Sequence, residues 1–246
     1  MSSSNSIRLF RFAGIDVYLH WSWLVVAFIE IQHRRGHYTS IAWNIAEYMI
    51  LFGIVLLHEF GHSLACKQVG GIANKIMLWP LGGVAYVSPP HRPGATLWSI
   101  AAGPLVNVVL LGVFTAAINI AGMYEIPTST PNFYRFLTAV WYMNIGLLIF
   151  NLLPVYPLDG GQILRSLLWF VCGPAWSLLA TSIIGVFGAV ALAGLAFLQK
   201  SPWIGIIAIF MILQCWQGLK ASRRMLKARI PGPIPASNHQ PPTIPG

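Results

Sequence analysis

Two histidines and a glutamate stand in an apolar segment that is long enough to cross a membrane. His58, Glu59 and His62 form the pattern H-E-x-x-H within residues Ile41–Cys66, which are otherwise almost all apolar. On a helix, the two imidazoles leave one face one turn apart, which suits two ligands of a tetrahedral zinc ion. Glu59 projects beside them and can act as a general base toward water. Since ionisable side chains at membrane depth are costly, the cluster predicts a functional metal site.

A catalytic zinc ion needs a third protein ligand and an open position. The chain has six acidic residues that could supply it, namely Asp16, Glu30, Glu47, Glu59, Glu125 and Asp159. Glu47 lies eleven residues before His58, which is about 16 Å along a helix. Asp159 follows a segment with two prolines, and a helix break at membrane depth is tolerated where it lines a cavity or is buried in protein. We therefore favour Asp159 as the third ligand, with His20 as the remaining rival.

The composition is that of an integral membrane protein. Of the 246 residues, 56% are hydrophobic and 9% are charged, against about 25% charged residues in a soluble domain. The net charge of +9 is attributed to basic residues that flank the spans and contact membrane lipids. No basic groove with interleaved aromatic residues is found, so a nucleic-acid partner is not expected. The three cysteines form no C-x-x-C pair, which argues against a cysteine zinc site and a disulfide framework.

Hydrophobic segments and turn signals predict an all-α polytopic membrane protein with six transmembrane helices. The expected spans are Ile15–Ile31, Ile41–Cys66, Ala95–Gly122, Phe133–Leu153, Trp176–Leu198 and Trp203–Leu219. Between them we expect a strand at Ile7–Phe12, a membrane-associated β-hairpin at 74–88 that turns at Pro80-Leu81-Gly82-Gly83, and a short helix at about 162–171. Residues 1–219 are expected to form the six-span core, and 220–246 a basic juxtamembrane segment with a Pro-rich, disordered tail.

The distribution of Lys and Arg predicts the orientation in the membrane. With the N-terminus in the cytoplasm, only Arg34, Arg35, Arg135 and Lys200 of the fifteen basic residues lie outside. Both termini are then cytoplasmic. His58 lies eight residues before the cytoplasmic end of its helix, which places it about 12 Å below that surface. The compact core favours the cell membrane of a prokaryote.

Three motifs resemble those of the site-2 protease family, the intramembrane zinc metalloproteases of peptidase family M50. They are HEFGH, AGPLVN at 102–107 and NLLPVYPLDGG at 151–161. The resemblance implies a single zinc ion per chain, held by His58, His62 and Asp159, with Glu59 as the catalytic base. It also implies a six-span core.

Two asparagines belong to the same motifs. The resemblance makes Asn151 a candidate for holding substrate or stabilising the oxyanion. A hydrogen bond that satisfies the broken helix is an equal alternative for Asn151. Asn107, in the second motif, is expected to be structural.

The resemblance implies hydrolysis of peptide bonds within or near the transmembrane segments of membrane-protein substrates by zinc-activated water. We see no room for a PDZ domain between the spans and no CBS domain after Leu219, which leaves regulation open to a separate protein. Two alternatives use the same residues: a zinc-binding or zinc-transporting membrane protein, and an inactive protease-like scaffold. A transporter needs polar groups along a path, whereas this sequence shows one cluster.

Overall fold

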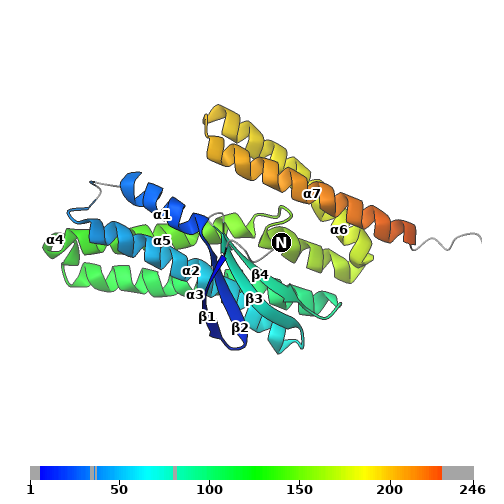
Figure 1. Cartoon of the computed structure of the whole chain (residues 1–246), viewed down its shortest axis with the longest axis horizontal. Coiled ribbons are helices and arrows are strands. Elements are labelled where there is room, and N and C mark those ends of the chain that lie inside the picture. Colours follow the sequence, from blue (N-terminus) through cyan, green and yellow to red (C-terminus); the bar gives the residue numbers. More distant parts are fainter. Residues whose placement is uncertain (1–5, 34–35, 37, 80–81, 229–246) are drawn as a thin grey trace, which may run out of the picture.

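The computed structural model describes residues 6–33, 36, 38–79 and 82–228, and it shows long helices with a small sheet beside them (Figure 1). The strands are β1 (Ser6–Phe12), β2 (Ile15–His20), β3 (Ile72–Trp79) and β4 (Gly82–Ser88). The helices are α1 (Ser22–His33), α2 (Ile41–Gln68), α3 (Pro93–Met123), α4 (Ile126–Ser129), α5 (Pro131–Leu152), α6 (Asp159–Leu198) and α7 (Pro202–Ala228).

Five helices in the described part of the chain are long and apolar enough to cross a membrane, namely α2, α3, α5, α6 and α7. The prediction of six spans is therefore confirmed for five. Helix α1 has 12 residues and rises about 18 Å, which is less than the roughly 30 Å of a hydrocarbon core. The chain is a multi-pass membrane protein.

The first predicted span, Ile15–Ile31, is wrong in its first part, because Ile15–His20 forms strand β2. Ile15 and Val17 are fully buried, whereas Asp16 between them and Tyr18 after them are more exposed. This alternation of buried and more exposed residues is typical of a strand with one covered face. Strand β2 runs parallel to β3, which lies some sixty residues later and which the sequence pattern near β2 does not reveal.

The sheet has the order β1-β2-β3-β4. It packs against α2 through a core that includes Val17 of β2, Ile76 of β3 and Val55 of α2. Strand β1 confirms the strand predicted at Ile7–Phe12, and β3 with β4 confirms the hairpin predicted at 74–88. Of the predicted turn, Pro80 and Leu81 lie outside the described residues. Among the residues that the structure describes, strand β4 pairs with β3 alone, so its other edge has no strand partner there.

Helix α6 is broken where the sequence predicts a break. Gly173 has φ 78° and ψ 173°, a conformation that favours glycine, and Pro174 follows it. The break separates the predicted short helix at 162–171 from the predicted fifth span, Trp176–Leu198. Helix α7 then runs beside the second part of α6 (Figure 1) and continues through the basic segment to Ala228. The tail predicted to be disordered lies outside the described residues.

Candidate metal centre

Helix α2 carries both histidines of the H-E-x-x-H pattern. Its first turn is capped by Ser40, whose hydroxyl oxygen accepts a hydrogen bond from the backbone N–H of Ala42 at 3.3 Å. The helix then runs unbroken to Gln68, so His58 and His62 lie one turn apart on one face. Only 4% of His58 and 5% of His62 are exposed. The helix therefore holds both imidazoles inside the protein.

Asp159 comes to this face of α2 from a distant part of the sequence, the start of α6. Helix α5 ends at Leu152, the chain continues without helix through Pro154 and Pro157, and Asp159 begins α6. The next two residues are Gly160 and Gly161, and a Cβ on either would overlap the backbone of the preceding segment. The two glycines thus let α6 start directly against this segment, which brings Asp159 to the histidines.

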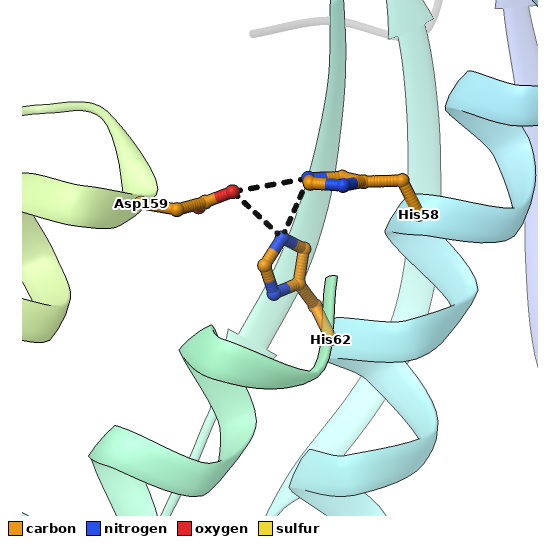
Figure 2. Close-up of side chains that lie close together, drawn as sticks. All are labelled: His58, His62 and Asp159. Atoms are coloured by element: carbon orange, nitrogen blue, oxygen red, sulfur yellow. Dashed lines mark hydrogen bonds and ion pairs between the residues drawn. The ribbon is translucent and has the colours of Figure 1, made fainter. Parts of the chain in front are cut away.

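The three side chains converge on one point (Figure 2). Nε2 of His58 lies 3.0 Å, and Nε2 of His62 3.4 Å, from Oδ2 of Asp159, and the two Nε2 atoms are 3.1 Å apart. Ligand atoms that hold a tetrahedral zinc ion at about 2.0–2.1 Å are separated from one another by roughly 3.3 Å. The observed triangle therefore has the size of one face of a zinc coordination shell.

The outer nitrogens of both rings are already hydrogen bonded. Nδ1 of His58 lies 2.6 Å from Oδ1 of Asn107, and Nδ1 of His62 lies 3.0 Å from the backbone carbonyl of Ser99. Both oxygens accept hydrogen bonds, so both Nδ1 atoms donate, and in the neutral rings both Nε2 atoms present lone pairs. Two such lone pairs and a carboxylate at these distances form a set of ligand atoms for one cation. The donor set therefore fits a metal ion, and two imidazoles with one carboxylate fit zinc.

Helices α2 and α3 approach closely at the site through two glycines. A Cβ on Gly61 would come within 2.6 Å of the backbone carbonyl oxygen of Ala102. A Cβ on Gly103 would overlap the ring of His62 and come within 2.9 Å of Nε2 of His58. Helix α3 can therefore reach both histidines with its backbone and its polar side chains. The sequence pattern does not predict the contact of Ser99 with His62. Asn107 belongs to the AGPLVN motif, but the sequence predicts only a structural role for it.

Glu59 lies beside the ligands and faces β4. Its side chain is 6% exposed, and a Cβ on Gly83 would overlap its carboxyl group. The backbone N–H of Ala85 is a hydrogen-bond donor for the Glu59 carboxylate. The cluster of ligand atoms contains His58, His62 and Asp159 but not Glu59. The Glu59 carboxylate is therefore not one of the predicted metal ligands, although Glu59 directly follows the ligand candidate His58 in the sequence.

Asn151 lies in the last turn of α5 and is half-buried. Among the described residues, its side chain makes no hydrogen bond, so its predicted role stays a prediction.

The rival ligand His20 is not part of the cluster. Its ring stacks on Trp79 with centroids 4.4 Å apart, and its Nδ1 is 2.5 Å from the hydroxyl of Ser22. Glu47 is also committed elsewhere, because its carboxylate accepts a hydrogen bond from the hydroxyl of Tyr38. Within the described ranges, His58, His62 and Asp159 are the single group of three or more metal-binding side chains whose ligand atoms come together.

The comparisons with known proteins find similarity to metalloproteases. Residues 115–195 match the model of peptidase family M50, and they include Asp159. Zinc metalloprotease MJ0392 of Methanocaldococcus jannaschii is 36% identical over 163 residues, which are 66% of this chain and 45% of the relative. Stage IV sporulation protein FB of Bacillus subtilis is 31% identical over 140 residues, which are 52% of this chain and 46% of the relative.

A solved structure shares the fold. The site-2 protease from Methanocaldococcus jannaschii superposes with a TM-score of 0.61 at 28% sequence identity, covering 87% of this chain and 95% of that chain. The chain spans about half the length of the curated relatives it matches. The matched family model, the relatives and the shared fold, together with the three motifs, support the assignment of this chain to the site-2 proteases of peptidase family M50.

Proposed function

We propose that this protein is an intramembrane zinc metalloprotease that hydrolyses peptide bonds within or near the transmembrane segments of membrane-protein substrates. One observation carries the proposal: His58, His62 and Asp159 converge inside a bundle of apolar helices, with Glu59 next to them. These three residues hold one zinc ion per chain. Costly polar groups at membrane depth are retained for function, and this donor set with an adjacent carboxylate is that of a metal-assisted hydrolase.

The chain's own residues then perform the acid–base chemistry. When bound, zinc supplies Lewis acidity toward the scissile carbonyl and toward water. The carboxylate of Glu59 accepts a proton from the attacking water and delivers it to the leaving amine. Asn151, in the last turn before the broken segment that leads to Asp159, holds the substrate or stabilises the oxyanion.

The unpaired edge of β4 offers a place for an extended substrate. A peptide bond in a helix is shielded, so the substrate must unwind before water can attack it. The backbone N–H of Ala85 faces Glu59. Along a strand, successive backbone N–H groups point to opposite edges, so the N–H of Val87, two residues later, points to the same edge as that of Ala85. An unwound segment that pairs with this edge as an added strand lies directly beside the Glu59 carboxylate.

The orientation follows from the distribution of basic residues, and the cellular setting from the compact core. We propose that both termini are cytoplasmic and that the protein lies in a prokaryotic cell membrane. Lys67 and the basic end of α7 are then on the cytoplasmic side, where anionic lipid headgroups attract them. Control of cleavage is left to a separate regulatory protein.

The decisive experiment compares the wild-type protein with Glu59→Gln on a panel of single-span reporter proteins in native membranes, at matched expression and zinc content. Gln keeps the shape of Glu but cannot take a proton. The proposal expects cleavage by the wild type and a loss of at least about a hundredfold in the variant, with zinc retained. Equal cleavage by both proteins would refute the role of Glu59. A wild type that binds no zinc would refute the metal site itself.

A further inference from the structure

Behind His58 lies a chain of two buried asparagines on two different helices. Asn107 of α3 and Asn144 of α5 are each 0% exposed. Nδ2 of Asn144 donates to the backbone carbonyl of Asn107 at 2.9 Å, and Nδ2 of Asn107 donates to Oδ1 of Asn144 at 2.8 Å. The remaining amide oxygen of Asn107 lies 2.6 Å from Nδ1 of His58. This series of hydrogen bonds therefore connects α5, which supplies no proposed metal ligand, to the proposed ligand His58 on α2.

The chemistry of the groups allows one direction of hydrogen bonding along this chain. A backbone carbonyl can only accept, so the NH2 group of Asn144 must face it. Oδ1 of Asn144 is then left to accept, so the NH2 group of Asn107 must face Asn144. That leaves the oxygen of Asn107 facing His58, which must therefore carry its ring hydrogen on Nδ1. The lone pair of His58 Nε2 is consequently directed at the metal site.

Asn107 alone could not impose this state. An asparagine amide has nearly the same shape after a half-turn about its last bond, which exchanges its oxygen and nitrogen. A turned Asn107 would present NH2 to Nδ1 of His58, and the ring hydrogen would then move to Nε2, the atom that faces the site. Asn144 prevents this turn by holding the NH2 group of Asn107.

We propose that Asn144, acting through Asn107, is a positioning residue that keeps His58 in its metal-binding tautomer. The inference rests on the proposed zinc site and not on proteolysis. Partners of this kind behind a metal-binding histidine typically account for a ten- to hundredfold change in metal affinity. The competing explanation is that the pair only joins α3 to α5, since hydrogen bonds between buried amides also hold membrane helices together.

The test measures the zinc affinity of the full chain in detergent by competition with a chelator, and the thermal midpoint of the zinc-free protein. Asn107→Leu is expected to weaken zinc binding by roughly ten- to hundredfold, and Asn144→Leu by several-fold to about tenfold. The double variant should bind zinc no more weakly than Asn107→Leu alone, because the effect of Asn144 on zinc binding passes through Asn107. Thr181→Val is the control, as this buried hydroxyl bonds only to carbonyls of its own helix.

Asn107→Asp provides the rescue. Its carboxylate can no longer donate a hydrogen bond to Asn144. It still accepts one from Nδ1 of His58, and because of this the zinc affinity should stay within about threefold of the wild type. The absorption spectrum of the cobalt-substituted protein should likewise match the wild type for this variant and change for Asn107→Leu.

The outcomes separate the explanations. Lower thermal midpoints with unchanged zinc affinity in both leucine variants would overturn the inference in favour of simple helix joining. Independent, multiplying losses in the double variant would overturn the serial arrangement, and loss of zinc from Asn107→Asp would overturn the role of the oxygen. A wild type without stoichiometric zinc would overturn the proposed metal site together with this inference.

Discussion

Gly103→Ala is the sharpest test of how tightly α3 closes on the metal centre. The added methyl group would overlap the ring of His62 and lie 2.9 Å from Nε2 of His58. Ordinary contact begins near 3.4 Å, so His58 must move by about 0.5 Å and His62 by about 1 Å. Metal–ligand distances in a formed site lie within about 0.2 Å of their typical values, so shifts of this size disturb the ligand geometry. Both rings are tethered at Nδ1, which restricts the ways in which they can yield.

Gly103→Ala has two opposing effects on the free energy of the folded protein. Replacing glycine by alanine within a helix stabilises it by about 1 kcal/mol, while overpacking a buried site costs about 1–3 kcal/mol. The cost falls on the ligand geometry, so it should appear in metal binding. At about 1.4 kcal/mol for each factor of ten, we expect zinc affinity to fall roughly ten- to hundredfold, and cleavage to fall with zinc occupancy.

Gly112→Ala is the matched control on the same helix. A Cβ at Gly112 meets nothing within 4 Å, so this variant should bind zinc like the wild type and unfold at an equal or higher temperature. The assay is chelator competition for zinc, with thermal unfolding of the zinc-free proteins beside it. If Gly103→Ala bound zinc as tightly as Gly112→Ala, the close packing of α3 on the histidines would be wrong.

Three further predictions test the third ligand, the strand edge and the orientation. Asp159→Ala should lose zinc on purification. It should also lack the stabilisation by zinc expected of the wild type, about 4 kcal/mol at a thousandfold excess over the dissociation constant; retention of both would remove Asp159 from the site. Val87→Pro should keep zinc but lower cleavage at least tenfold, since it removes one N–H from the free edge of β4, and full cleavage would exclude strand addition there. In a Cys172→Ser background, an impermeant thiol reagent applied to intact cells should label Ser129→Cys but not Ser88→Cys, and the reverse result would invert the topology.

The local pattern of the sequence contains much of the metal site. His58 and His62 are four residues apart on one apolar helix, so their common face follows from helix geometry and needs no information about the rest of the fold. Asp159 could be selected because acidic residues are scarce and because the prolines before it end α5. The break at Gly173 and Pro174 is equally local, since both residues act on the backbone at their own position.

The tertiary structure decided which elements surround these ligands. Strand β2 pairs with its neighbour β1 across a turn at Ala13 and Gly14, and also runs parallel to β3. Its apolar residues lead directly into the apolar helix α1, and the distant β3 is what places β2 inside the sheet, so the sequence pattern predicts one continuous span there. The place of Glu59 beside β4 has the same origin, since it depends on how the sheet packs on α2.

The sequence by itself therefore determined the membrane class and the candidate metal ligands: two histidines with Glu59 beside them, and Asp159. Only the tertiary structure decided that α3 supplies Ser99 and Asn107 behind the histidines and that α5 supports Asn107 through Asn144. The physical reason is that a spacing within one helix constrains side chains through the local backbone. The partners of those side chains on other helices depend on close contacts, such as those at Gly61 and Gly103, that exist only once the helices have packed.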